Sequence, residues 1–199
     1  MAIANKILKN FALFIDGFGF AGNVESAQLP TVEVMKEDFR AGGMEGSIAI
    51  DMGLNALEAS WKLHSFDENA LSTWGLGEGY RVDVILRGAL ESLDGSVTPI
   101  EAYMQGTIRS VAPSEFTAGG KASLDFVMDV RVYRYTSGGS LIYDIDVINN
   151  KRVIRGLDVN KEINSALGNS PSTLIADIAS GSGISRAQNV INGIGGIFG

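Results

Sequence analysis

Apolar and polar residues alternate with a period of two through the middle of the chain. Between residues 124 and 132 the even positions carry Leu124, Phe126, Met128, Val130 and Val132, whereas the odd positions, Val127 excepted, are polar. Successive side chains of a strand point to opposite faces of a sheet. The pattern therefore predicts a long strand with one buried face and one polar face.

Three other segments alternate in the same way, which predicts further strands. Their apolar positions are Leu57, Ala59, Trp61 and Leu63, then Val82, Val84 and Leu86, then Ile100, Ala102, Met104 and Ile108. The dipeptides Asp94-Gly95, Gly119-Gly120 and Gly138-Gly139 are typical of tight turns between strands. The predicted fold class is mainly β, an antiparallel β-sandwich or barrel-like subunit.

Two short helices are predicted beside these strands. Asp67 can cap a turn that runs through Leu71 and Trp74 and ends at Gly75. Near residue 160, Asp158 or Asn160 can cap a second, flanking helix. Its apolar positions are Val159, Ile163, Ala166 and Leu167, and Gly168 is placed to end it.

Two segments show neither period. Residues 41–53 contain four glycines, and we interpret them as a long loop, which in a compact domain is usually functional or disordered. Residues 169–199 contain six glycines and only two charges, Asp177 and Arg186. The sequence thus predicts a β domain over residues 1–168 and a C-terminal extension over 169–199, with a short helix near 172–179 and a flexible tail.

Composition excludes several kinds of chemistry. The 199 residues include no cysteine and one histidine, which removes thiol nucleophiles and most metal sites. The net charge of −7 argues against nucleic-acid binding through basic residues. No segment approaches the ~20 apolar residues of a membrane span. We expect a protein of the cytoplasm, without a membrane partner.

No catalytic, cofactor or metal site is predicted, and the chain is not expected to be an enzyme. The glycines at 75, 77 and 79 lack the lysine and hydroxyl of a phosphate-binding loop. Asp144 and Asp146 share one face of a predicted strand, which we interpret as a solvated surface. Tyr103, Tyr133 and Tyr135 are assigned to polar faces, without forming a platform for a ligand.

Several short strings together resemble one family, the major tail tube proteins of contractile-tailed phages, also found in R-type pyocins. The strings are Leu13-Phe14-Ile15-Asp16-Gly17, Phe39-Arg40-Ala41-Gly42-Gly43-Met44, Ile50-Asp51-Met52-Gly53 and Gly156-Leu157-Asp158. The resemblance covers about residues 10–168. Val147 departs from it, because the family pattern has a proline there, and residues 169–199 lie beyond it.

The resemblance implies a structural subunit of a virion or of a tail-like particle. It implies homohexameric rings that stack into a hollow conduit, through which DNA passes into the host. It also implies contacts with the sheath, baseplate and tail terminator proteins, and assembly in the host cytoplasm. Whether the particle carries DNA or is a headless tail stays open.

Two sets of site residues follow. The resemblance assigns an inter-ring loop to Arg40, Gly42, Gly43, Met44, Ile50, Asp51, Met52 and Gly53. The strand faces that carry Glu58, Lys62, Asp125, Asp129 and Arg131 are expected to include the lumen surface, with a net acidic wall that repels DNA. The alternative function is a β-sandwich binding or adaptor module for a carbohydrate or protein ligand, and a hydrolytic enzyme is the third hypothesis.

Overall fold

The structure is a computed structural model that describes residues 6–75, 77, 79–115 and 117–168. Its strands are β1 (Ile7–Ile15), β2 (Phe18–Gly19), β3 (Val24–Gln28), β4 (Val34–Phe39), β5 (Ile48–Leu54), β6 (Leu57–Leu63), β7 (Val82–Glu91), β8 (Val97–Pro113), β9 (Leu124–Ser137), β10 (Ser140–Asp146), β11 (Lys151–Ile154) and β12 (Leu157–Asp158), and its helices are α1 (Glu68–Leu71) and α2 (Lys161–Ala166). The predicted mainly antiparallel β class is confirmed. The predicted C-terminal extension over residues 169–199 lies outside the described residues.

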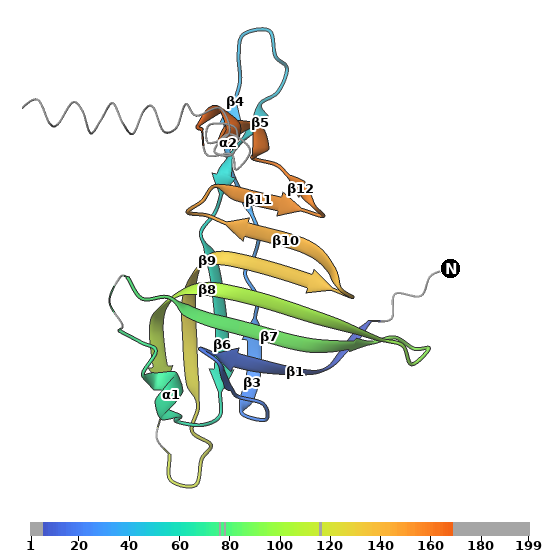
Figure 1. Cartoon of the computed structure of the whole chain (residues 1–199). Coiled ribbons are helices and arrows are strands. Elements are labelled where there is room, and N and C mark those ends of the chain that lie inside the picture. Colours follow the sequence, from blue (N-terminus) through green and yellow to red (C-terminus); the bar gives the residue numbers. More distant parts are fainter. Residues whose placement is uncertain (1–5, 76, 78, 116, 169–199) are drawn as a thin grey trace, which may run out of the picture.

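Ten strands form one continuous antiparallel sheet that bends into two layers (Figure 1). The first layer, called here the body sheet, has the order β12-β11-β10-β9-β8-β7-β1-β2. The second, the cross sheet, consists of β3, β6, residues 124–130 of β9 and residues 107–113 of β8. The long β8–β9 hairpin belongs to both layers, so β9 pairs first with β6 and then with β10.

Two register shifts produce the bend. Gln105 pairs with Val132 and Gly106 with Val130, which leaves Arg131 unpaired as a bulge in β9. A second shift leaves Arg109 unpaired in β8. A Cβ atom added to Gly106 would lie 2.0 Å from the carbonyl oxygen of Asp129. Bulges bend strands and increase their twist, and here the backbones approach so closely that only glycine fits.

The bulge also reverses the buried face of β9, which the alternation in sequence did not predict. Even positions are buried from Leu124 to Val130, but beyond Arg131 the buried residue is Tyr133, only 3% exposed. The predicted core position of Val132 and the polar-face position of Tyr133 are therefore wrong. Tyr133 lies in the core with its ring 6.3 Å from that of Tyr143, and burial raises the pKa of its phenol.

The hydrophobic core lies between the two layers. Trp61 of β6 stacks on Phe126 of β9, with ring centroids 5.5 Å apart and planes inclined by 9°. The remaining predicted core positions of the other three alternating segments are all buried: Leu57, Ala59, Leu63, Val82, Val84, Leu86, Ile100, Ala102, Met104 and Ile108. The three predicted turn dipeptides connect β7 to β8, β8 to β9 and β9 to β10. Alternation thus identified the core strands, because each layer buries one face only.

Both helices are short. The Asp67 carboxylate accepts hydrogen bonds from the backbone N–H groups of Asn69 and Ala70, which confirms the predicted cap of α1. The helix ends at Leu71, and the chain continues as a turn through Trp74. Helix α2 has no buried residue, and Gly168 follows its end with a φ of +75°.

Replacing Gly106 with alanine should destabilise the fold by roughly 3 kcal/mol, the upper end of the cost of overpacking, because the Asp129 carbonyl cannot move without breaking the sheet. Urea unfolding of the unassembled subunit measures the change. Gly46→Ala is the matched control, since its added Cβ meets nothing within 4 Å. Equal stability of the two variants would contradict the close approach.

Candidate assembly surfaces

One long two-stranded ribbon crosses the body sheet and extends beyond it (Figure 1). Its base is β3 paired with β6, and its distal half is β4 paired with β5, called here the projecting hairpin. Between the halves, the Asn55 N–H donates to the Glu33 carbonyl at 2.9 Å, and its side-chain amide donates to the Glu33 carboxylate at 3.1 Å. These bonds keep the two halves of the ribbon connected.

The predicted loop over residues 41–53 is wrong in its second half. Residues 48–54 form β5, which places Ile50, Asp51 and Met52 in a strand. The connection is only the apex between β4 and β5, and it contains Arg40, Gly42, Gly43 and Met44. Gly53 has a φ of +108° and lies beside a register shift between β4 and β5. This glycine therefore marks a bulge in β5 rather than a loop.

The projecting hairpin carries an exposed apolar face. Phe39 pairs with Ile48, and Ile50 pairs with Glu37 on the same face, which the alternation extends to Met35. The exposed fractions of the four apolar residues on this face, Met35, Phe39, Ile48 and Ile50, lie between 42% and 51%. A two-stranded ribbon alone is marginally stable in water. Contiguous exposed apolar side chains of this kind mark an interaction surface.

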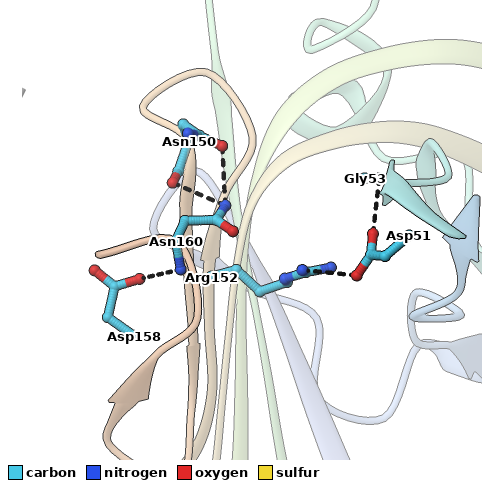
Figure 2. Close-up of polar contacts among 6 residues, drawn as sticks. All are labelled: Asp51, Gly53, Asn150, Arg152, Asp158 and Asn160. Carbon is cyan, nitrogen blue, oxygen red and sulfur yellow. Dashed lines mark hydrogen bonds and ion pairs between the residues drawn. The ribbon is translucent and has the colours of Figure 1, made fainter. Parts of the chain in front are cut away.

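An ion pair attaches the base of this hairpin to the body sheet. Asp51 of β5 accepts from the Arg152 guanidinium of β11 at 2.9 Å and from the Gly53 N–H at 2.8 Å (Figure 2). The Gly53 hydrogen bond, and after it Arg152, holds the pKa of Asp51 below its ordinary value of 3.8. The Arg152 side chain is only 15% exposed, so the body sheet holds it in place and it can orient the hairpin.

Asparagine side chains attach α2 to the neighbouring turn. The Asn160 side-chain amide donates to the Asn150 carbonyl oxygen at 3.1 Å and to its side-chain oxygen at 2.9 Å, and Asn164 donates to the same carbonyl at 3.0 Å. Asp158 accepts from the Asn160 N–H at 3.0 Å (Figure 2). Polar bonds therefore hold α2 in place, rather than apolar burial.

The interpretation of Asp144 and Asp146 as a solvated pair is corrected for Asp144. Its carboxylate lies between Arg134, at 3.4 Å, and Lys151, at 2.5 Å, and its side chain is only 9% exposed. Asp146 accepts from the side chain and N–H of Asn149 instead. The two partners of Asp144 come from strands adjacent in space, β9 and β11, which alternation along one strand cannot reveal.

The outer face of the cross sheet collects most of the residues predicted to face the lumen. Glu58 pairs with Asp129, and Lys62 with Asp125, in the register of β6 and β9. Arg131 is not part of this pairing, because it stands half-buried at the bulge. The structure therefore brings four of the five predicted residues together.

Two charged residues of this face were missed by the sequence reasoning. Arg109 forms ion pairs with Glu58 and with Asp129, the latter at 3.1 Å. Glu25 of β3 lies 3.7 Å from Lys62. Alternation alone places Arg109 on a polar strand face, and Glu25 lies in a strand without clear alternation. Only the strand register and the ion pairs assign both residues to this surface. The face carries Glu25, Glu58, Asp125 and Asp129 against Lys62 and Arg109, and is net acidic.

The cross sheet ends in two edges at which the described residues supply no further strand. On one side, β3 pairs only with β6. On the other, β7 pairs with β8 as far as Gly106, so residues 107–113 present an unpaired edge. The Trp74 indole N–H donates to the Arg109 carbonyl at 3.3 Å, which satisfies one group of this edge. Open strand edges are sites at which another chain can add a strand.

In the part of the chain that the structure describes, no cluster of three or more metal-ligating side chains is found. Its helices are all too short and too polar to cross a membrane. The candidate surfaces described above are two strand edges, one acidic face and one apolar hairpin.

The pKa of Asp51 is lowered in the native structure, so its carboxylate should favour the anchored hairpin above pH 3.8, and this preference should disappear as the pH falls through the native value. Replacing Arg152 with methionine should raise the pKa of Asp51, but not as far as 3.8. The hydrogen bond from the Gly53 N–H, which is the larger cause of the lowered pKa, remains. An NMR titration of the Gly53 amide reports this. Asp94→Asn, at a remote turn, is the control and should leave the pKa of Asp51 unchanged. An unchanged pKa of Asp51 in the Arg152→Met variant would contradict the ion pair.

The sequence profile described as phage tail tube protein FII matches residues 5–168. The tail tube protein of Escherichia phage P2 is 28% identical over 164 residues, which cover 79% of this chain and 94% of that protein. The major tail tube protein of Serratia phage KSP20 is 30% identical over 155 residues, covering 75% and 86%.

Two solved structures share the fold. A chain of the extended sheath–tube complex of an extracellular contractile injection system (PVC) matches over 68% of this chain and 94% of its own length, with 10% identity and a TM-score of 0.51. The sheath/tube terminator of the same system matches 68% and 99%, with 10% identity and a TM-score of 0.52. The relatives of this chain in sequence, the two phage tail tube proteins, are structural proteins rather than enzymes. The chain thus belongs to the phage tail tube protein FII family, as a structural tail tube component of the virion.

Proposed function

We propose that this subunit forms hexameric rings that stack into a hollow tube, through which DNA passes into the host cell. The observation that carries this proposal is the pair of open edges of the cross sheet, β3 on one side and residues 107–113 of β8 on the other. Such a four-stranded sheet can pair with copies of itself on both sides. A heterologous contact of this kind generates a ring when the rotation closes.

Ring closure pairs β3 of one subunit with the end of β8 of the next. Each backbone N–H and C=O left open by the isolated subunit then finds a partner, and a closed barrel has no edges on which other chains can aggregate. The inner faces of these strands carry the core residues Trp61, Phe126 and Met128, so the core side of the barrel is already covered by the body sheet. The acidic outer face of the cross sheet is left to line the lumen.

The charge of that face suits a conduit for DNA. Four carboxylates against two cations repel a duplex, which carries one negative charge per ~1.7 Å of axis. Arg109 is held between Glu58 and Asp129, so its positive charge is not available to bind phosphate. The wall therefore offers DNA no strong binding site at which it could stop.

The projecting hairpin provides the contact between rings. The hairpin extends beyond the body sheet (Figure 1), and its exposed apolar side chains can reach a neighbouring ring. In this arrangement the body sheet lies on the outside of the tube, where it can contact other proteins. The likeness to a chain of a sheath–tube complex, and to a sheath/tube terminator, supports a sheath and a tail terminator as partners, with a baseplate at the other end and assembly in the host cytoplasm.

Cysteine pairs test ring closure, because the natural chain has no cysteine. Ser26→Cys in β3, combined with Ser110→Cys or Ala112→Cys in β8, should give intermolecular disulfides in assembled tubes, since adjacent strands bring Cα atoms within disulfide range. A non-reducing gel should show a ladder that ends at six subunits. Ser26→Cys with Leu93→Cys, in the distant β7–β8 turn, should give none. Tubes without a ladder would refute this edge pairing, and a ladder ending elsewhere would refute the hexamer.

The lumen assignment has its own test. Ser60→Cys places one thiol at the centre of the acidic face, between Glu58 and Lys62. In assembled tubes a small maleimide should label it, whereas a maleimide carried on a 20-kDa-class polymer, on the order of the subunit's own size, should not. In separated subunits both reagents should react. Leu93→Cys, 72% exposed, is the control for an outward position, and equal labelling of Ser60→Cys by both reagents in tubes would contradict the assignment.

A further inference from the structure

A groove of about 530 Å³ opens between the base of the projecting hairpin, the β10–β11 turn and α2. Its floor includes Ile145, which is fully buried. Its apolar walls are Met52, Val147, Val159 and Ile163, each between 48% and 56% exposed. The Asp51–Arg152 ion pair of Figure 2 lies in the same groove. Apolar side chains from three elements thus converge on a space that no described residue fills.

Helix α2 lacks apolar packing contacts among the described residues. It has six residues and none of them is buried. Ile163 and Leu167 are 56% and 63% exposed and lie four positions apart, on one face. A helix of this length is unstable without tertiary packing, and the bonds of Asn160 and Asn164 to the Asn150 turn leave Ile163 and Leu167 exposed. An apolar segment in the groove would supply the missing contact.

We propose that the segment around residues 174–178 of the same chain occupies this groove. The family match ends at residue 168, where α2 has just ended, and the sequence continues from there for the 31 residues 169–199. The first apolar side chains of that extension are Leu174, Ile175 and Ile178. One carboxylate, Asp177, is the only charge before Arg186, so the segment itself brings a single charged group to the groove.

The extension can reach the groove of its own subunit. The six residues of α2 rise by about 9 Å, and the groove is lined by its first turn, at Asn160 and Ile163. Six extended residues after Gly168 span up to about 20 Å, so Leu174 can return over that distance. The positive φ of Gly168 ends the helix and turns the chain away from its axis. A tethered segment is also present at an effective concentration in the millimolar range, which favours it over another copy.

Disulfide trapping tests this in the full-length, unassembled subunit. Val159→Cys combined with Ile175→Cys should form a disulfide within one chain. Trypsin cuts at Lys161, between the two positions, so mass spectrometry should find the two peptides joined. In a mixture of ¹⁴N and ¹⁵N subunits the joined peptides should carry a single label. Ile175→Cys with Leu93→Cys is the control and should not react.

Mixed-label peptides would show that another copy supplies the segment, and absence of the disulfide would show an empty groove; either result overturns the proposal. A second variant avoids cysteine. Val159→Asp should make thermolysin cleave near Leu174 at least ~5-fold faster, whereas Leu157→Asp, 71% exposed and outside the groove, should not. Equal rates would also overturn it. Because the subunit is unassembled, these outcomes are independent of whether rings are hexameric.

Discussion

The close approach of β8 and β9 at Gly106 is the constraint on which the rest of the structure depends. A Cβ there would lie 2.0 Å from a backbone oxygen, so the two strands can cross from one layer to the other only at a glycine. With the bulges at Arg109 and Arg131, this contact divides a single hairpin between two sheets. The core then forms between the layers instead of on one side of a flat sheet.

The same bend creates the surfaces available for assembly. Beyond Gly106, β8 leaves β7, and its remaining residues stay unpaired along one side. The strand therefore ends as an open edge that belongs to the cross sheet, opposite the edge of β3. Open edges are normally a hazard. The proposed ring would close through these two edges, so the feature that builds the core would also determine where the neighbour binds.

The sequence predicted what depends on neighbours along the chain and missed what depends on neighbours in space. Alternation located the strands and the core face from Leu57 to Met128, because a half-buried strand needs an apolar residue at every second position. It failed at Tyr133, since a one-residue bulge reverses the faces without any signal in composition. The glycines at 42, 43 and 53 concealed a hairpin, and only the pairing of strands showed Arg134 and Lys151 around Asp144. The burial of Tyr133 also removes one of the aromatic residues that a carbohydrate platform would need.

The projecting hairpin combines a firm base with an uncovered apolar face. Arg152 and the Glu33–Asn55 bonds fix its direction, so little conformational freedom remains to be lost when a partner covers it. Fully burying one large apolar side chain contributes about 1.5–3 kcal/mol, and four half-exposed ones can therefore contribute a few kcal/mol at each contact. Such a contact is weak for two isolated subunits. In the stacked rings proposed above, every subunit would repeat this contact and the contacts would act in parallel. Single subunits would then bind each other weakly, whereas whole rings would hold together.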